Sequence, residues 1–308
     1  MSEDKPWPDS IRAGDCERHE PLVRRVLAPN PSPYTFTGTQ TWLVGAGSDV
    51  AVIDPGPTGS GMSIGDPSDA HGAGHVEAIL RAVESEGQRV AAILCTHTHR
   101  DHSPAAAPLK AATGAPIVGC APLALSDDGP RADSAFDPDY APDRVLADGE
   151  RVSGDGWTLE AVATPGHTSN HLCFALIESG ALFTGDHVMA WSTSVVSPPD
   201  GDMAAYMASL SKLHDRDDRV YYPAHGPAVA KPRQLVRGML GHRRQRERQI
   251  LRELEKGTRA IPEMVTHMYK GLDPRLTGAA GRSVLAHLID LGARGMVRAD
   301  GEQWELAR

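Results

Sequence analysis

The chain has 308 residues, a length that favours either one large domain with a small appendage or two domains, and its 40% hydrophobic and 23% charged residues are typical of a globular protein. Its formal net charge of −9 argues against general affinity for nucleic acid. No apolar run approaches the roughly 20 residues of a membrane-spanning helix, so we expect no membrane partner.

The first segments with regular patterns follow a polar N-terminal stretch. Residues 34–47 and 49–59 begin as strands and end in glycine or Pro-Gly, which predicts a hairpin and a loop that begins at Asp54. Residues 75–87 carry apolar side chains at helical spacing, and residues 89–96 form a continuous apolar run. We therefore expect an amphipathic helix followed by a buried strand.

The stretch CTHTHRDHSP, from Cys95 to Pro104, follows this buried strand. It places three histidines and one aspartate within six residues, an arrangement that packing a core does not require. Ser103 and Pro104 have the residue types of an N-cap and a first helical residue, which predicts a helix over 103–115.

The middle of the chain repeats short strands joined by glycine turns. WTLEAVATPGHTSNH, LCFALIESG and ALFTGDHV read as strands, and RVYYPAHGP is a further strand that ends in a histidine. Residues 126–143 are predicted to be an acidic loop, and the later part of the segment SPPDGDMAAYMASLSKLHD a helix. This alternation predicts α and β layers around a sandwich core.

The C-terminal part of the chain differs in charge from the rest. Residues 231–308 hold 16 basic and 9 acidic residues, whereas residues 1–230 hold 15 basic and 31 acidic residues. The tail reads as a long basic helix, further helices and a final two-stranded wing. We therefore expect a catalytic domain over 1–230 and a small C-terminal domain over 231–308.

The cysteines indicate a reducing compartment. None forms a CxxC pair, so we expect mostly buried, reduced thiols and a cytoplasmic location. The charged N-terminal 20 residues contain no apolar core of a signal peptide. The four cysteines are Cys16, Cys95, Cys120 and Cys173.

Histidines and aspartates recur where predicted strands end. Loops at strand ends meet at one edge of a sheet, where sites are usually built. Five imidazoles and two carboxylates suit zinc or another first-row metal, and seven ligands are too many for one zinc ion but enough for two. Taken alone, His167 or His225 is more often a hydrogen-bonded structural residue. The seven candidates are His97, His99, Asp101, His102, His167, Asp186 and His225.

Four of these segments, in this order, carry a family resemblance. HTHRDH, TPGHT, TGDH and PAHG resemble the motifs of the metallo-β-lactamase fold hydrolase superfamily over roughly residues 25–230. The resemblance implies an α+β fold, an αββα sandwich with a two-metal site at one edge, here followed by a winged-helix-like C-terminal domain.

The resemblance also implies roles for the candidate ligands. His97, His99 and His167 would hold one metal, Asp101, His102 and His225 the other, and Asp186 would bridge them. Two zinc ions are the expected cofactors, with iron or manganese left open. A hydroxide between the metals would attack the substrate, and Asp101 would be the catalytic residue that orients it and transfers a proton.

Three further residues flank this set. Asp54 matches the family's early aspartate turn and would support the site, with a loop-start cap as the alternative. His171 and His187 lie beside ligands in the sequence and read as polar shell residues rather than as substrate contacts.

The expected bridging residue Asp186 narrows the choice among the branches of the superfamily. Glyoxalase II-like, lactonase-like and ribonuclease-like branches carry such a residue, whereas true zinc β-lactamases lack it, so antibiotic hydrolysis is disfavoured. NPSPYTFTGTQTWLVG, VVSPPDGDMAAYMASL and the winged-helix-like ending are similar to the β-lactamase-like protein 2 branch. That branch includes a single-stranded RNA endonuclease, and related fungal enzymes release polyketides from carrier-protein thioesters.

Two functions follow from this resemblance. We predict a dinuclear metal hydrolase of a small ester, thioester or lactone, acting on a small-molecule or acyl-carrier substrate. The alternative, a metal-dependent single-stranded RNA endonuclease, would bind RNA through basic residues such as Arg243 and Arg244. The helix expected to enter a groove offers only Arg282 and Arg294, so nucleic acid is not favoured.

The role of the tail is a separate question. Acidic residues alternate with the basic ones on its long helix, as on a solvated, salt-bridged face. We interpret the tail as a lid or as a dimerisation element, which leaves a homodimer among the expected assemblies. A redox protein with a di-iron site is a third class, which an iron-type absorption spectrum would favour.

Overall fold

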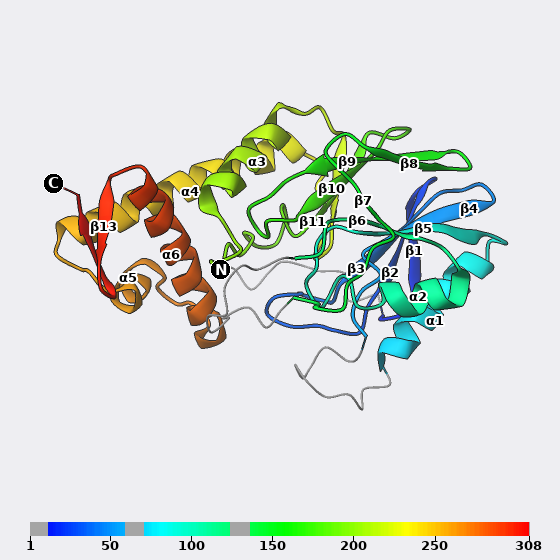
Figure 1. The fold of residues 1–308 in the computed structure, drawn as a ribbon, viewed down its shortest axis with the longest axis horizontal. Helices are drawn as coiled ribbons and strands as arrows, with labels where there is room; N and C mark the ends of the chain where they lie inside the picture. Colours follow the sequence, from blue (N-terminus) through cyan, green and yellow to red (C-terminus); the bar gives the residue numbers. More distant parts are fainter. Residues whose placement is uncertain (1–11, 59–70, 124–135, 308) are drawn as a thin grey trace.

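The computed structural model describes residues 12–58, 71–123 and 136–307, which form a two-sheet sandwich with helices outside it and a C-terminal helical unit (Figure 1). Most of the acidic loop expected at 126–143 and part of the loop expected to begin at Asp54 lie outside the described residues.

Within these residues the first sheet contains seven strands, which lie in space in the order of the chain. They are β1 (Cys16–Glu20), β2 (Val23–Leu27), β3 (Gln40–Val44), β4 (Asp49–Ile53), β5 (Arg89–Cys95), β6 (Ile117–Gly119) and β7 (Arg144–Val145). Strands β1 to β4 are antiparallel to their neighbours, whereas β4 to β7 are parallel. The apolar run of β5 therefore lies inside the sheet, between β4 and β6.

The second sheet, counted over the same residues, contains five strands in the spatial order β12-β11-β10-β9-β8. They are β8 (Arg151–Gly154), β9 (Trp157–Ala163), β10 (Leu172–Leu176), β11 (Ala181–Gly185) and β12 (Val220–Pro223). Strands β11 and β12 are parallel, and the other pairs are antiparallel. Strands β9, β11 and β12 consequently run in one direction, so their carboxyl ends lie at the same edge.

The core follows from the alternation of side chains along each strand. In β10, Leu172, Phe174 and Leu176 belong to the cluster between the two sheets. Cys173 and Ala175 point to the opposite face, where they join a second cluster with helix α3 (Met203–Asp215). Because successive strand residues face opposite sides, both faces of this sheet are buried.

Helices cover the outer faces of the sandwich. Helices α1 (His71–Glu84) and α2 (Ala106–Thr113) pack against β5 of the first sheet, and α3 and α4 (Pro232–Glu255) pack together beside the second sheet (Figure 1). This αββα order confirms the fold class expected from the sequence.

The C-terminal unit has its own apolar cluster. It contains α5 (Ile261–Met268), the short helix η1 (Pro274–Leu276), α6 (Thr277–Ala293) and the hairpin β13 (Val297–Asp300) and β14 (Gln303–Leu306). The first half of α4 packs into the α3 cluster, and its second half, with Ile250 and Leu254, packs into the C-terminal cluster. The domain division expected at residues 230 and 231 stays a prediction, because α4 belongs to both clusters.

Two local predictions were wrong. Strands β1 and β2 occupy the stretch expected to be a polar lead-in, because Arg24 and Arg25 are buried with polar partners. Helix α2 begins at Ala106 after Ala105, not after a Ser103 cap, and Ser103 Oγ donates a hydrogen bond to Asp137 Oδ2 instead.

Among the described helices, none is both long enough and apolar enough to cross a bilayer.

Candidate metal centre

Every candidate ligand lies just beyond the carboxyl end of a strand. The segment from His97 to His102 follows β5, His167 follows β9, Asp186 follows β11 and His225 follows β12. Strand β5 belongs to the first sheet and the other three strands to the second. The site is therefore built where both sheets end at one edge of the sandwich.

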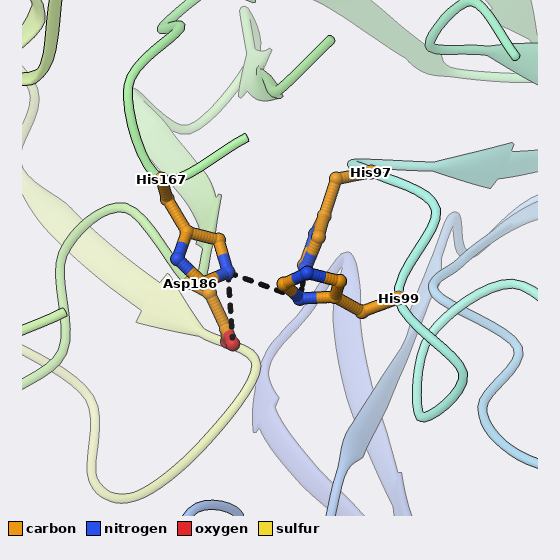
Figure 2. A group of neighbouring side chains, drawn as sticks. All are labelled: His97, His99, His167 and Asp186. Atoms are coloured by element: carbon orange, nitrogen blue, oxygen red, sulfur yellow. Dashed lines mark hydrogen bonds and ion pairs between the residues drawn. The ribbon is translucent and has the colours of Figure 1, made fainter. Parts of the chain in front are cut away.

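Three histidines and one aspartate form the first cluster (Figure 2). His99 Nδ1 lies 3.0 Å from His97 Nε2 and 3.2 Å from His167 Nε2, and His167 Nε2 lies 3.7 Å from Asp186 Oδ2. One ligand atom from each of the four residues lies within 4.8 Å of the others. Four donor atoms thus converge from three separate segments of the chain.

Asp101, His102 and His225 form the second cluster. His225 Nε2 lies 3.1 Å from Asp101 Oδ2, and His102 Nε2 lies 3.4 Å from the same oxygen. Asp186 stands between the clusters, because its Oδ1 is 3.3 Å from His225 Nε2 and its Oδ2 is 3.6 Å from His102 Nε2.

The opposite nitrogen of most of these imidazoles is held by the protein. Nδ1 of His167 lies 2.6 Å from the carbonyl oxygen of Val195, and Nδ1 of His225 lies 3.3 Å from that of Gly38. Nδ1 of His102 lies 3.0 Å from Asp54 Oδ2. Since these partners accept hydrogen bonds, each Nδ1 carries a proton, and Nε2 is the atom that points into the site.

Asp54 also organises the loop that follows β5. Its Oδ1 accepts a hydrogen bond from the Thr96 amide at 2.7 Å, and its Oδ2 accepts one from Thr96 Oγ1 at 2.8 Å. Asp54 has a φ of 49°, a left-handed conformation that aspartate tolerates better than most residues. Thr96 Oγ1 in turn lies 3.0 Å from His97 Nδ1, so one carboxylate serves both clusters.

The loop after Asp186 is tied to the site at two points. Ser194 Oγ donates a hydrogen bond to the carbonyl oxygen of Asp186, and the adjacent Val195 supplies the acceptor for His167. Gly185, just before Asp186, has no room for a side chain, because a Cβ there would lie 2.7 Å from both His171 Nε2 and Thr96 Oγ1.

The donor set fits a metal on the evidence of its own unsatisfied atoms. Nε2 of His102, Nε2 of His225 and Oδ1 of Asp186 are buried without a hydrogen-bond partner in the described structure. Buried polar atoms are rarely left in this state, and here they face one another. Imidazole nitrogens and carboxylate oxygens are ligands of zinc, iron and manganese.

The electrostatics of the two clusters differ. Burial and the surrounding imidazoles hold the pKa of His97 well below its usual range, and burial lowers the pKa of His167 to about 4. Burial opposes protonation of His102, but Asp101, Asp186 and Asp54 raise its pKa well above the usual value. His97 and His167 are therefore neutral imidazoles at neutral pH, whereas His102 lies among three carboxylates that favour its protonated form.

His171 and His187 lie outside both clusters. Each is at most 1% exposed, and His171 Nδ1 lies 2.9 Å from Thr164 Oγ1. The ring of His187 packs on Tyr206, with ring centroids 4.6 Å apart. These positions place both histidines in the buried wall behind the site.

Sequence reasoning missed several residues that position the site. The carbonyl groups of Val195 and Gly38 carry no residue-type signal, because any residue supplies a carbonyl. Thr96 could have been predicted as a supporting residue, since it directly precedes His97 in the sequence. Arg243 was grouped with exposed basic residues, but it is 3% exposed and its Nη2 donates a hydrogen bond to the carbonyl oxygen of Ser194.

Comparisons with known proteins agree with this geometry. Residues 34–225 match the family model described as the metallo-beta-lactamase superfamily, and residues 260–304 match the beta-lactamase associated winged helix domain. The lactamase-like protein adaB of Aspergillus niger is 30% identical over 284 residues, which cover 87% of this chain and 79% of that protein. An atrochrysone carboxyl ACP thioesterase of Aspergillus fumigatus is 32% identical over 236 residues, 76% of this chain and 65% of its own length.

Solved structures share the fold at lower identity. A beta-lactamase domain protein from Burkholderia ambifaria has a TM-score of 0.76 at 21% identity, covering 99% of this chain and 97% of its own. A metallo-beta-lactamase family protein from Thermus thermophilus has a TM-score of 0.73 at 21% identity, covering 94% of this chain and 100% of its own. The two structures extend the likeness through the C-terminal unit.

Proposed function

Because the chain belongs to the metallo-beta-lactamase superfamily and is a metal-dependent hydrolase, we propose that it uses a dinuclear zinc site to cleave the thioester of a carrier-bound acyl group. The observation that carries the proposal is the convergence of seven donor side chains at one edge of the sandwich, three of whose inward atoms, His102 Nε2, His225 Nε2 and Asp186 Oδ1, are buried without a hydrogen-bond partner. The proposal specifies one member of the ester, thioester and lactone class expected from the sequence.

The two clusters would hold one metal each, and Asp186 would contact both. When bound, the metals supply Lewis-acid activation of the acyl carbonyl and of the attacking water. The residues on the far side of the imidazoles, Asp54 and Thr96 among them, keep the ligands oriented and raise their basicity.

Asp101 is the residue we propose for proton transfer. Its side chain is 28% exposed, whereas those of His102 and His225 beside it are at most 1% exposed, so it reaches the open side of the site. An Asp101 oxygen can accept a proton from the attacking water as the new C–O bond forms, and deliver it to the sulfur as the C–S bond breaks. The products are then a carboxylic acid and a free thiol.

The substrate class is argued from the relatives. The Aspergillus fumigatus protein is described as a thioesterase that acts on a carboxyl ACP, and it shares 32% identity with this chain. A thioester needs no nucleophilic serine or cysteine when the water is activated directly. Cys95, the cysteine just before the first ligands, is fully buried, and we assign it no role as a nucleophile.

The test pairs metal content with hydrolysis. Purified protein should contain about two zinc ions per chain by elemental analysis and should hydrolyse a small acyl thioester. His97→Ala and Asp186→Ala should each lose zinc and activity together, while His214→Ala, on the outer helix α3, should keep both. Full activity in the double variant His97→Ala/Asp186→Ala would contradict the proposal.

The ribonuclease alternative stays a prediction. Its support is the exposed Arg244, whereas Arg243 is buried and Arg282 is bonded to the carbonyl oxygen of Pro198 at 3.3 Å. Arg294 is paired with Glu247 and Asp290. Metal-dependent cleavage of single-stranded RNA, lost in His97→Ala, would favour this alternative over the thioesterase.

A further inference from the structure

The exposed side of helix α4 carries arginines that the fold does not use. Arg237, Arg244, Arg248 and Arg252 are all exposed, and none has an ion pair or side-chain hydrogen bond with another described residue. Their spacing of seven, four and four residues places them along one side of the helix. We call these four residues the basic face of α4.

This lack of partners is unusual for the C-terminal part of the chain. Arg233 lies 3.8 Å from Asp217, Arg294 bonds to Glu247, and Arg298 bonds to Glu305. Glu253 does not pair with the basic face, because it is 7% exposed and bonded to His267 and Lys256. Glu255 is the exposed acidic residue on α4, and it lies at the C-terminal end.

An apolar pocket of about 540 Å³ adjoins the basic face. Gly238 and Met239 of α4 form one wall, and Ala190, Thr193 and Val229 form another. Ala190 and Thr193 lie on the loop that follows Asp186, and Val229 lies four residues after His225. The pocket therefore lies beside segments that lead directly from the candidate metal centre.

Two glycines connect the pocket with the basic face. Gly238 lines the pocket, and Gly241, three residues on, is a helical neighbour of both Arg237 and Arg244. A Cβ at either position would meet nothing within 4 Å among the described atoms. Glycine in a helix interior is unfavourable, and here no internal contact requires it. Such a surface lets another backbone approach α4 closely.

From these contacts we propose that the basic face of α4 and the adjoining pocket dock an acidic acyl carrier protein that presents the thioester substrate. The inference rests on the proposed thioesterase function and adds the place where the partner binds. Acidic side chains of the carrier pair with the arginines, and an apolar side chain of the carrier enters the pocket.

The charge balance of the chain favours an acidic partner at this surface. Residues 1–230 hold 31 acidic and 15 basic residues, so their net negative charge disfavours an acidic protein, whereas the basic face of α4 attracts it. Single-stranded RNA fits the face less well, because α4 has no Phe, Tyr or Trp on which bases could stack. The favoured occupant is therefore a protein rather than a nucleic acid.

The experiment compares one acyl group on two thiols. The zinc-loaded protein is assayed with an octanoyl thioester on a strongly acidic acyl carrier protein and with the octanoyl thioester of N-acetylcysteamine. The double variant Arg244→Glu/Arg248→Glu should raise KM for the carrier substrate roughly tenfold. It should leave kcat and the small-thioester kinetics unchanged, and it should flatten the salt dependence of KM.

Controls separate docking from folding and from net charge. Arg81→Glu on α1 makes the same charge change as Arg244→Glu alone, far from α4 (Figure 1), and should leave both substrates unaffected. Melting temperatures of all variants establish that they are folded, and Arg244→Gln, a milder change, should raise KM for the carrier less than Arg244→Glu.

Three results would overturn the docking proposal. They are an unchanged carrier KM in the double variant, an equal rise in Arg81→Glu, and tight binding of a single-stranded RNA oligonucleotide that the double variant loses. Failure to hydrolyse the small thioester is a different result, because it overturns the proposed thioesterase function itself.

Discussion

Arg243 of helix α4 donates a hydrogen bond to the carbonyl oxygen of Ser194, on the loop that follows Asp186. Its guanidinium also lies over the ring of Tyr206, 5.0 Å from the centroid. Ser194 bonds to the carbonyl of Asp186, and Val195 accepts from His167. A residue of α4 therefore supports the loop that orients two candidate ligands.

We expect Arg243→Met to weaken metal binding. Without the guanidinium, the Ser194 carbonyl is buried without a partner and the loop loses its anchor, so the apparent zinc affinity should fall about 10- to 100-fold. Competition with a chromophoric chelator measures this affinity. Arg244→Met changes the neighbouring exposed arginine and should bind zinc as the wild type does. A lower melting temperature with unchanged zinc affinity would make Arg243 a purely structural residue.

Asp54→Asn should separate site organisation from general stability. Asp54 accepts from two Thr96 donors and faces His102 Nδ1, so an amide in either orientation opposes one donor with another. We expect a 10- to 100-fold loss of zinc affinity and a stability loss of about 1–3 kcal/mol.

The matched control for this prediction is Asp49→Asn. Asp49 is a buried carboxylate that accepts from Trp157 Nε1 and the Asp155 amide, away from both clusters. The Asp49→Asn variant should lose comparable stability in denaturant titrations and should retain zinc. Equal zinc affinities of the two variants would remove Asp54 from the site.

Some of this architecture was predictable from the sequence, because the signals were local. Each candidate ligand follows an apolar run that ends in a turn residue, so its place at a strand end could be read directly. His97 and Asp186 therefore appeared in the expected positions relative to β5 and β11. Their roles as ligands stay a prediction until metal is measured.

Other features depend on partners distant in the chain. Arg24 lies in β2, a strand that reads as polar, and it is buried because its Nη1 donates to the Ala82 carbonyl, 58 residues away. Arg243 looks like its exposed neighbours until the position of Ser194 is known. Neither periodicity nor residue type contains that information, so burial of a charged residue was the step that sequence reasoning could not make.

A pH-dependence prediction concerns His75 of α1. Burial lowers its pKa to about 4, and its Nε2 lies 2.8 Å from Thr41 Oγ1. In the unfolded chain His75 binds a proton near pH 6.5, whereas in the folded protein it does so only near pH 4. The free energy of unfolding therefore falls as the pH drops from about 6.5 towards 4. Between pH 7 and pH 5, protonation of His75 should lower the free energy of unfolding by about 2 kcal/mol.

Denaturant titrations of metal-free protein at both pH values measure this effect. His75→Gln should lose about 2 kcal/mol less than the wild type over the same interval. His214→Gln changes a partly exposed histidine on α3 and should follow the wild type. Parallel pH profiles for wild type and His75→Gln would contradict the assignment.

Thiol reactivity should distinguish Cys16 from the other three cysteines. Cys16 is exposed, although partial burial raises its pKa too, whereas the other three cysteines are buried, which raises the pKa of Cys120 and of Cys173 to about 12 and that of Cys95 well above its usual value. A thiolate is the reactive form, so a disulfide reagent should titrate one thiol in the native protein and four after unfolding. Cys16→Ser should remove the native reaction, and a second fast thiol would show that a buried cysteine is accessible.

The glycines of α4 provide the last prediction. Gly241 lies inside a 24-residue helix, and a Cβ there would meet no described atom within 4 Å. Gly241→Ala should therefore raise stability by about 1 kcal/mol and the melting temperature by about 2 °C. Gly166→Ala is the opposing control, because its Cβ would lie 2.3 Å from the Tyr206 backbone at a φ of 135°. If Gly241→Ala is more stable than the wild type, the fold does not need this glycine. The role of the glycine then lies on the exposed side of α4. A loss of stability would instead place an internal contact at Gly241.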